Sequence, residues 1–359
     1  MKKILVIQQK MIGDVLLSTL ICENIKLNYP EYQVHYLVNH NTLPVLENNP
    51  YIDKLIILGA KQDESYFELI KFAKELNQEK YDVVIDAYSK IQSWTTVFYN
   101  KAPQKISYFK KGRAFLYTDT IKKHKVAKTN LGLAIEHRLA LLAPLNIKVV
   151  KQCPELYVTP QEIEETKLLF KTHHIDNNKP NIMISLLGSD AIKTYPLNYM
   201  AQIVDFIGQN YDVNILFNYF PKQYNEANYV LSQCSSVTKS KIAFNLYGGN
   251  LRSFIAIMSQ CDIIIGNDGG AINMAKALNK KSFIIFSPWI EKRDWATFED
   301  GINHVSVHLN DYMPELFKKK KTKALKALTY KYYNFFEPNL FSNKLQNFLN
   351  TQLNYKYEK

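Results

Sequence analysis

The sequence alternates short apolar runs with longer stretches in which apolar residues recur every three or four positions. Residues 3–9 form the first such run, and helical spacing follows over residues 13–26. Alternation of this kind predicts parallel strands joined by crossover helices. A stretch with two prolines, residues 151–160, interrupts the pattern, which restarts with a strand over residues 181–186. We therefore predict an α/β fold with two doubly wound, Rossmann-like domains.

The chain of 359 residues is long enough for two domains of ordinary size. We place an N-terminal domain at residues 1–160 and a C-terminal domain at residues 161–335, and we expect a last helix within residues 336–359. Doubly wound sheets bind ligands at the carboxyl ends of their strands. The two domains are therefore expected to face a central cleft that holds the active site.

The composition narrows the class of protein. Hydrophobic residues make up 47% and charged residues 22% of the chain, as in ordinary soluble proteins. The apolar runs are far shorter than the roughly 20 residues that a membrane-spanning helix needs, and the first residues do not resemble a signal peptide. The four cysteines are scattered, which indicates free thiols in a reducing cytoplasm.

The net charge is +12, and lysines cluster within residues 105–128 and 318–326. A basic surface attracts polyanions such as nucleic acid, anionic lipid or a phosphorylated glycan. The same excess is equally typical of solvated surface lysines. The sequence contains no zinc finger, RNA-binding signature or aromatic–basic repeat, so nucleic acid is not an expected partner.

The first strand leads into Gly13 and Asp14 at the start of a helix. A single glycine does not make the tight turn of a Gly-x-Gly-x-x-Gly motif, which argues against an NAD-type site. Asp14 has two interpretations. It is either a first-turn carboxylate that stabilises the helix end, or a cleft residue that accepts a proton from an acceptor hydroxyl.

A second motif, Gly-Asn-Asp-Gly-Gly at residues 266–270, joins a buried strand to a helix. The free N–H groups and the positive dipole end of such a helix suit an anionic phosphate. Gly269 and Gly270 leave the backbone open to a diphosphate, and Asp268 either caps the helix or orients a donor hydroxyl. An ordinary helix cap after a flexible turn has the same sequence pattern.

A third motif, residues 186–196, follows the first strand of the C-terminal half and lies at the same edge of the predicted sheet. It contains Gly188, Ser189 and Lys193. Lys193 is suited to neutralise a departing diphosphate, and Ser189 to donate a hydrogen bond to a phosphate oxygen. Taken alone, Lys193 is better explained as a solvated surface lysine.

A fourth loop, residues 217–223, is expected to flank a nucleoside. Gln223 is suited to hydrogen-bond ribose hydroxyls, and Tyr219 or Phe220 to pack on a base, although core packing is expected for at least one of the two rings. No Asp-x-Asp pair, nucleophile motif or Walker loop occurs, and the histidines lack metal-ligand spacing. We therefore expect the diphosphate to be stabilised without a metal ion or other cofactor.

Together these motifs resemble glycosyltransferase family 9, the ADP-heptose:lipopolysaccharide heptosyltransferases. The resemblance spans most of residues 1–300 in the same order, through residues 3–7, 12–20, 49–54, 81–86, 193–196, 266–270, 274–278 and 286–288. It implies a GT-B fold in which the N-terminal domain binds the acceptor and the C-terminal domain binds the nucleotide sugar. It also implies that the helix in residues 336–359 packs back on the N-terminal domain.

The resemblance further implies an inverting direct displacement. Asp14, beside Gly13 at the acceptor site, matches the proposed base of the family, and Lys193 matches its phosphate-binding lysine. Residues 268–270 match its donor turn. The chain departs from the family pattern at three positions, where the family usually has a hydroxyl residue, a histidine and an acidic residue: Gly269, Asn273 and Gln223.

The sequence therefore predicts the transfer of heptose or a related sugar from a nucleotide-diphosphate donor to a lipopolysaccharide core or similar glycan. Expected partners are the nucleotide sugar, a lipid-linked or phosphorylated acceptor, and anionic membrane at the cytoplasmic face of the inner membrane. Two alternatives remain open. One is a nucleotide-sugar epimerase of the same fold, and the other is a non-catalytic glycan- or nucleotide-binding protein.

Overall fold

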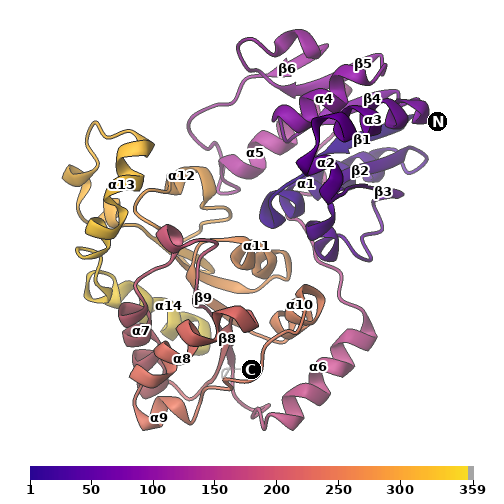
Figure 1. Cartoon of the computed structure of the whole chain (residues 1–359). Coiled ribbons are helices and arrows are strands. Elements are labelled where there is room, and N and C mark those ends of the chain that lie inside the picture. Colours follow the sequence, from indigo (N-terminus) through magenta and orange to yellow (C-terminus); the bar gives the residue numbers. More distant parts are fainter. Residues whose placement is uncertain (355–359) are drawn as a thin grey trace. The chain divides into compact units, whose positions relative to one another are not determined.

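The computed structural model describes residues 1–354 and divides the chain into two compact units, Met1–Tyr157 and Val158–Lys359. Each unit contains one sheet whose strands are all parallel, packed against helices (Figure 1). This confirms the predicted α/β class and the two Rossmann-like domains.

The sheet of the first unit has six strands in the order β3-β2-β1-β4-β5-β6. The chain proceeds outward from β1 to β2 and β3, then continues at β4 on the other side of β1. Such a reversal of strand order opens a crevice at the carboxyl ends of the two strands that flank it, here β1 and β4. The elements are β1 (Lys3–Ile7), α1 (Ile12–Asn28), β2 (Gln33–Asn39), β3 (Lys54–Leu58), α2 (Ala60–Glu64), α3 (Tyr66–Leu76), β4 (Val83–Asp86), α4 (Ile91–Tyr99), β5 (Gln104–Tyr108), β6 (Asp119–Ile121) and α5 (Leu133–Ala140).

The first apolar run becomes a central strand because both of its faces are covered. Residues 4–7 of β1 are at most 1% exposed, as expected for a strand with helices on both sides. Helix α1 is fixed to the sheet by the hydroxyl of Tyr36 on β2, which donates to the carbonyl of Val15 at 2.8 Å. The loop after β1 and the first turn of α1 are thereby held beside the crevice.

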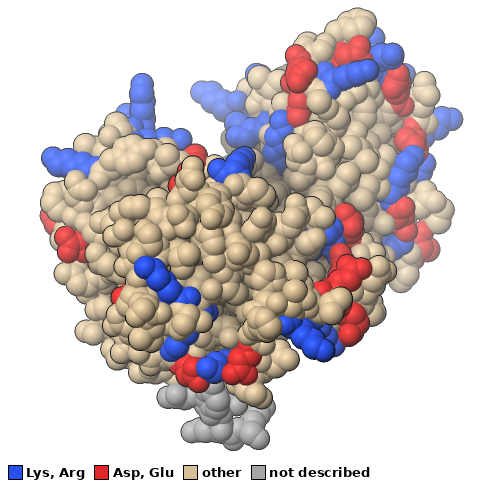
Figure 2. Space-filling model, turned by 60° about the horizontal axis from the view of Figure 1, so that its bottom comes forward, with Lys and Arg blue, Asp and Glu red and all other residues tan. Residues whose placement is uncertain are grey.

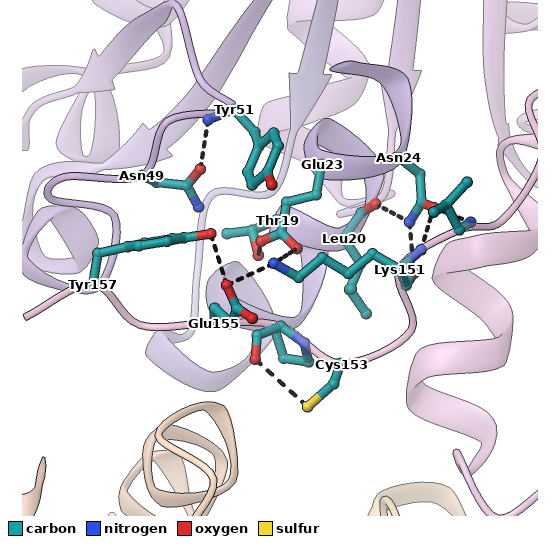
Figure 3. A network of polar contacts seen from close by, with 12 residues as sticks. Thr19, Leu20, Glu23, Asn24, Asn49, Tyr51, Lys151, Cys153, Glu155 and Tyr157 are labelled. Carbon is teal, nitrogen blue, oxygen red and sulfur yellow. Dashed lines mark hydrogen bonds and ion pairs between the residues drawn. The ribbon is translucent and has the colours of Figure 1, made fainter. Parts of the chain in front are cut away.

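The last segment of the first unit is attached to α1 (Figure 3). The Asn24 side chain accepts hydrogen bonds from the N–H groups of Val150 at 2.7 Å and Lys151 at 2.9 Å, and donates to the Lys151 carbonyl at 2.7 Å. The Lys151 ammonium lies 2.7 Å from the Glu155 carboxylate and 3.5 Å from the buried carboxylate of Glu23. The predicted linker therefore begins as an ordered segment fixed to α1.

The sheet of the second unit has five strands in the order β11-β10-β9-β7-β8. Its strand order reverses between β7 and β9, so the loops after these two strands border a second crevice. The elements are α6 (Pro160–Thr172), β7 (Asn181–Ser185), α7 (Leu197–Asn210), β8 (Asn214–Asn218), α8 (Tyr224–Gln233), α9 (Ser236–Lys239), α10 (Leu251–Ser259), β9 (Ile263–Asn267), α11 (Gly270–Ala277), β10 (Lys281–Ile285), α12 (Lys292–Trp295), β11 (His304–Val307), α13 (Thr322–Tyr333) and α14 (Ser342–Asn354).

Helix α14 is part of the hydrophobic core of the second unit. Leu345, Phe348 and Leu349 are buried in this core, and the Phe348 ring lies 5.6 Å from the ring of Phe283 on β10. The family resemblance led us to expect that residues 336–359 pack back on the N-terminal domain, and this stays a prediction. The apolar side of α14 is covered by the core of its own unit. The expectation also included residues 355–359, which lie outside the described part of the chain.

Candidate active site

The predicted site residues lie next to the two switch points, the places where the strand orders reverse. In the first unit, Gly13 and Asp14 belong to the first turn of α1, after β1. In the second unit, the remaining residues follow three adjacent strands. Gly188, Ser189 and Lys193 follow β7, Gln223 follows β8, and Asp268, Gly269 and Gly270 follow β9.

The turn after β9 leads directly into α11. Gly269 is the N-cap and Gly270 the first helical residue, so the first N–H groups of α11 are exposed at the end of the strand. Gly269 has an extended backbone with φ of 164°, and a Cβ atom built on it would meet nothing within 4 Å. The backbone therefore does not require glycine at this position, and there is room beside it.

Asp268 is a desolvated carboxylate beside two lysines. Burial raises its pKa to about 6, while the charges of Lys193 and Lys276 and the N–H of Gly269 act in the opposite direction. Lys193 therefore lies close enough to Asp268 for its charge to act on the carboxylate. A carboxylate in this state accepts hydrogen bonds from hydroxyl groups at neutral pH and becomes protonated in mild acid.

The loop after β7 is folded tightly onto Lys193. A Cβ atom on Gly188 would lie 2.5 Å from the Lys193 carbonyl oxygen, so no larger residue fits without a shift of the backbone. The Gly188 N–H donates to the Thr194 hydroxyl at 3.1 Å, and the Asp190 carboxylate accepts from the Lys193 N–H at 3.1 Å. Ser189 is exposed on the same loop. The position of Lys193 is thus set by backbone contacts.

Asn267, at the end of β9, connects the two loops, a role that the sequence did not reveal. Its side chain is 1% exposed; its oxygen accepts from the Tyr195 N–H at 2.7 Å, and its nitrogen donates to the carbonyls of Ser185 at 3.0 Å and Leu186 at 2.7 Å. Because all these bonds are buried, Asn267 holds the Lys193 loop against the strand that carries Asp268. Asn273, in the first turn of α11, donates to the Gly269 carbonyl at 3.3 Å.

In the loop after β8, the predicted ribose-binding residue Gln223 forms a hydrogen bond within its own loop. The Gln223 side-chain oxygen accepts from the Phe220 N–H at 2.9 Å, which closes a short turn. Tyr219 lies in the core, where its ring stacks on Phe244 and its hydroxyl donates to the Phe244 carbonyl at 2.9 Å. Of the two aromatic candidates, Phe220 is the exposed one, at 43%.

In the first unit, Asp14 forms an ion pair with Arg138 of α5, which the sequence did not identify as part of the site. Arg138 Nη2 lies 2.5 Å from Asp14 Oδ1, Nε donates to the Ser18 hydroxyl at 2.8 Å, and Nη1 donates to the Ala134 carbonyl at 2.6 Å. Arg138 is 8% exposed, while 23% of the Asp14 side chain is exposed. Arg138 therefore fixes one carboxylate oxygen of Asp14 and balances its charge.

The other strand of this switch point, β4, ends in Asp86, which is fully buried. Burial raises its pKa, while hydrogen bonds from the N–H groups of Ser89 at 2.8 Å and Tyr88 at 3.1 Å and from the Tyr117 hydroxyl at 2.7 Å favour the charged form. These contacts shape the loop after β4. Asp86 is therefore a structural residue of the crevice.

Cationic side chains lie on aromatic rings near the carboxyl ends of β4 and β5. We name this set the cation–aromatic cluster: Lys110 and Arg113 lie 5.0 and 4.7 Å from the centre of the Trp94 ring, Lys122 lies 5.8 Å from that of Phe109, and Lys123 lies 3.9 Å from that of Tyr108. Within residues 1–354, none of these four cations has a carboxylate within 4.0 Å. Elsewhere on the surface, Lys and Arg side chains stand next to Asp and Glu in some places and alone in others (Figure 2).

Lys123 is the cation of the cluster that lies nearest to its ring, 3.9 Å from the centre of Tyr108. Burial lowers its pKa to about 8, the charges of Arg138, Lys90 and Lys110 lower it further, and Asp14 acts in the opposite direction. Lys123 is therefore close enough to Asp14 and Arg138 to sense their charges. The cluster places uncompensated positive charge beside the crevice that holds Asp14.

In the part of the chain that the structure describes, no three His, Cys, Asp or Glu side chains gather closely enough to hold a metal ion. Among the same residues, every helix is too short or too polar to cross a membrane.

Comparison with known proteins identifies the family of the chain. The profile of glycosyltransferase family 9 (heptosyltransferase) matches residues 69–326. Lipopolysaccharide heptosyltransferase 1 of Campylobacter coli is 24% identical over 316 residues, which cover 84% of this chain and 88% of that protein.

Two solved structures share the fold. The glycosyl transferase family 9 protein of Veillonella parvula aligns with a TM-score of 0.70 at 18% identity, covering 89% of this chain and 90% of that one. The E. coli ADP-heptose lipopolysaccharide heptosyltransferase II aligns with a TM-score of 0.66 at 18% identity, covering 85% and 89%. The fold is therefore GT-B, the two-domain architecture of a large class of glycosyltransferases. The chain belongs to glycosyltransferase family 9, as its motifs suggested.

Proposed function

We propose that this glycosyltransferase moves heptose, or a related sugar, from a nucleotide-diphosphate donor to a lipopolysaccharide core or another cell-surface glycan. The observation that carries the proposal is the arrangement of Lys193 beside Asp268 and the start of α11, at the switch point of the second unit. The proposed sugar, donor and acceptor come from the names of the relatives, since one is a lipopolysaccharide heptosyltransferase and another an ADP-heptose lipopolysaccharide heptosyltransferase. ADP-heptose is therefore the first donor to test.

The donor diphosphate is proposed to lie on the N–H groups of Gly269 and Gly270, where the dipole of α11 favours negative charge. Lys193 balances the charge that develops on the leaving diphosphate. The exposed Ser189 hydroxyl provides a further donor on the same side, and Gly188 allows the close approach of the Lys193 backbone.

Two more residues complete the proposed donor site. Asp268, with its pKa near 6, is suited to accept a hydrogen bond from a hydroxyl of the donor sugar. The amide nitrogen of Gln223 is suited to donate to ribose hydroxyls, while its oxygen is already bonded to the Phe220 N–H.

The proposed reaction is a single displacement with inversion. The acceptor hydroxyl oxygen forms a bond to the anomeric carbon, while the bond from that carbon to the diphosphate oxygen breaks and its electron pair leaves with the nucleoside diphosphate. Asp14 takes the hydroxyl proton. Because Arg138 occupies only Oδ1 of Asp14 in its ion pair, the second carboxylate oxygen is the proposed proton acceptor.

An anionic acceptor suits the first unit. The cation–aromatic cluster carries four positive charges near the Asp14 crevice, and phosphates or carboxylates of a lipid-linked glycan would balance them. Gly13 and Asp14 are proposed to contact the acceptor hydroxyl. The same positive charge favours contact with anionic lipid at the cytoplasmic face of the inner membrane.

We propose that the reaction needs no metal ion or other cofactor, because Lys193 and α11 supply the positive charge at the diphosphate. Transfer should therefore continue at full rate in excess EDTA. Restoration of activity by Mg²⁺ or Mn²⁺ after EDTA treatment would contradict this part of the proposal.

A transfer assay with ADP-heptose, with and without a lipopolysaccharide-core acceptor, tests the function. We expect release of ADP that depends on the acceptor, and a product whose anomeric configuration by NMR is opposite to that of the donor. Conversion of the donor sugar without acceptor would favour an epimerase. Absence of binding to any nucleotide sugar in calorimetry would favour a non-catalytic protein.

A further inference from the structure

Two lysines from different parts of the second unit share one aromatic ring. Lys193 Nζ lies 5.6 Å and Lys326 Nζ lies 4.2 Å from the centre of the Trp289 ring. Lys326 comes from α13, and Trp289 follows β10, the strand next to β9. The basic segment within residues 318–326, which the proposed reaction does not use, therefore reaches the same place as the Lys193 loop.

Hydrogen bonds hold the loop that carries Lys193 against α13, the helix that carries Lys326. The Ile192 carbonyl, next to Lys193, accepts from the Ser287 hydroxyl at 2.6 Å and from the Tyr333 hydroxyl at 3.4 Å. Tyr333 is buried and belongs to α13, and Ser287 is two residues before Trp289. The loop after β7, the loop after β10 and α13 thus converge on one backbone carbonyl, which holds Lys326 near Lys193.

Among the described residues, neither lysine at this place forms an ion pair, and Asp268 acts on Lys193 only from beyond ion-pair distance. Neither Lys193 nor Lys326 has a carboxylate within 4.0 Å among residues 1–354. The segment 316–336 contains seven lysines and no acidic residue. Cation–π contacts of this kind stabilise a lysine by only about 0.5–1 kcal/mol at exposed sites, which does not compensate for bringing two unpaired ammonium groups to one ring.

A departing nucleoside diphosphate has the complementary charge. It carries about three negative charges, one on the inner phosphate and between one and two on the terminal phosphate. Lys193 supplies one positive charge and the start of α11 supplies about half of another. One further cation within reach of the terminal phosphate would balance the leaving group.

We propose that Lys326 is this second cation, held over Trp289 to bind the terminal phosphate of the donor's diphosphate together with Lys193. The proposal rests on the proposed donor site and adds a residue from α13 to it. It predicts that α13 contributes to the discrimination between nucleoside diphosphates and nucleoside monophosphates.

Calorimetric titration of the full-length protein with ADP and with AMP tests this role. Lys326→Gln should weaken ADP binding by about fivefold to twentyfold, the scale of one hydrogen bond to a charged group, and AMP binding by less than twofold. The matched control is Lys331→Gln, an exposed lysine on the same helix without a contact to Trp289. It should leave both affinities unchanged, and Lys326→Arg should restore most of the ADP affinity.

The outcomes separate this inference from the proposed function. If the wild-type protein binds no nucleoside diphosphate, the donor site itself is refuted. If the wild-type protein binds ADP, and Lys326→Gln and Lys331→Gln bind it equally well, only the role of Lys326 is refuted. A loss of ADP and AMP affinity by the same factor in Lys326→Gln also overturns the role, because a terminal-phosphate contact acts on ADP alone.

Discussion

The two switch points hold their functional side chains in different ways. In the first unit, Asp14 is fixed by Arg138, which lies 124 positions further along the chain, so the site depends on one ion pair between two helices. In the second unit, the Lys193 backbone is held by the close approach of Gly188 and by hydrogen bonds of Asn267 to the same loop. The position of Asp14 should therefore be sensitive to the loss of its charged partner Arg138. The position of Lys193 should be sensitive to an added side chain at Gly188.

The largest expected effect is that of Asp14→Asn. The variant keeps the shape of the side chain but cannot accept the acceptor proton, so turnover should fall by about 10²- to 10⁴-fold, the usual contribution of a general base. ADP affinity should stay unchanged, because residues 268–270 belong to the other unit. Steady-state rates together with calorimetry measure both quantities, and undiminished turnover would remove Asp14 from the reaction.

Arg138→Met should lower turnover by about tenfold to a hundredfold through Asp14. It should also lower the free energy of unfolding by about 1–3 kcal/mol, because it removes buried, charged hydrogen bonds. The combination with Asp14→Asn distinguishes positioning from a purely structural role. If Arg138 acts by positioning Asp14, the double variant should be no slower than Asp14→Asn alone, whereas independent roles give multiplied losses.

Gly188→Ala and Gly269→Ala form a matched pair in the second unit. The new methyl group at Gly188 would lie 2.5 Å from the Lys193 carbonyl, whereas at Gly269 it would meet nothing within 4 Å. Overpacking costs about 1–3 kcal/mol, and we expect most of it as lost ADP affinity in Gly188→Ala. Gly269→Ala should bind ADP within about threefold of wild type. Equal affinities of the two variants in calorimetry would show that the loop does not position Lys193.

The smallest expected effect is on pH dependence. Since burial raises the pKa of Asp268 to about 6, lowering the pH from 7.5 to 5.5 protonates this carboxyl and removes its repulsion of the diphosphate. The affinity for an ADP-sugar, whose phosphates do not titrate in this range, should therefore rise by about threefold to tenfold as the pH falls. The same titration of Asp268→Asn should be flat, and a parallel rise in that variant would assign the effect to another group.

The same pKa shift has a consequence for stability. A carboxyl whose pKa is raised in the folded state binds more protons there than in the unfolded chain, so its contribution to stability is lost as the pH rises from about 4 to 6. Asp268→Asn should remove this contribution to the pH dependence of Tm. The sign is opposite to that of an ion-paired carboxylate.

The sequence was most informative where function depends on short, continuous motifs. The alternation of strands and helices predicted the fold class. The sequence also predicted that the loops of residues 186–196 and 266–270 lie at one sheet edge, because they follow neighbouring parallel strands. These inferences need only local pattern and strand order.

The contacts that join distant residues were not predictable in this way. The pairing of Arg138 with Asp14 and the seating of cations on Trp94 depend on tertiary packing, which a single sequence does not display. Strand β6 and most of β5 fall within the basic region 105–128, where charge obscured the apolar pattern.

The most direct test of the central claim is calorimetric titration of ADP into the wild-type protein and into Lys193→Ala. The account predicts that the wild type binds ADP more tightly than AMP, and that Lys193→Ala loses about 1.5–3 kcal/mol of ADP binding, the value of a hydrogen bond to a charged group. An ADP affinity that is the same in both proteins would contradict the assignment of the second switch point as the donor diphosphate site.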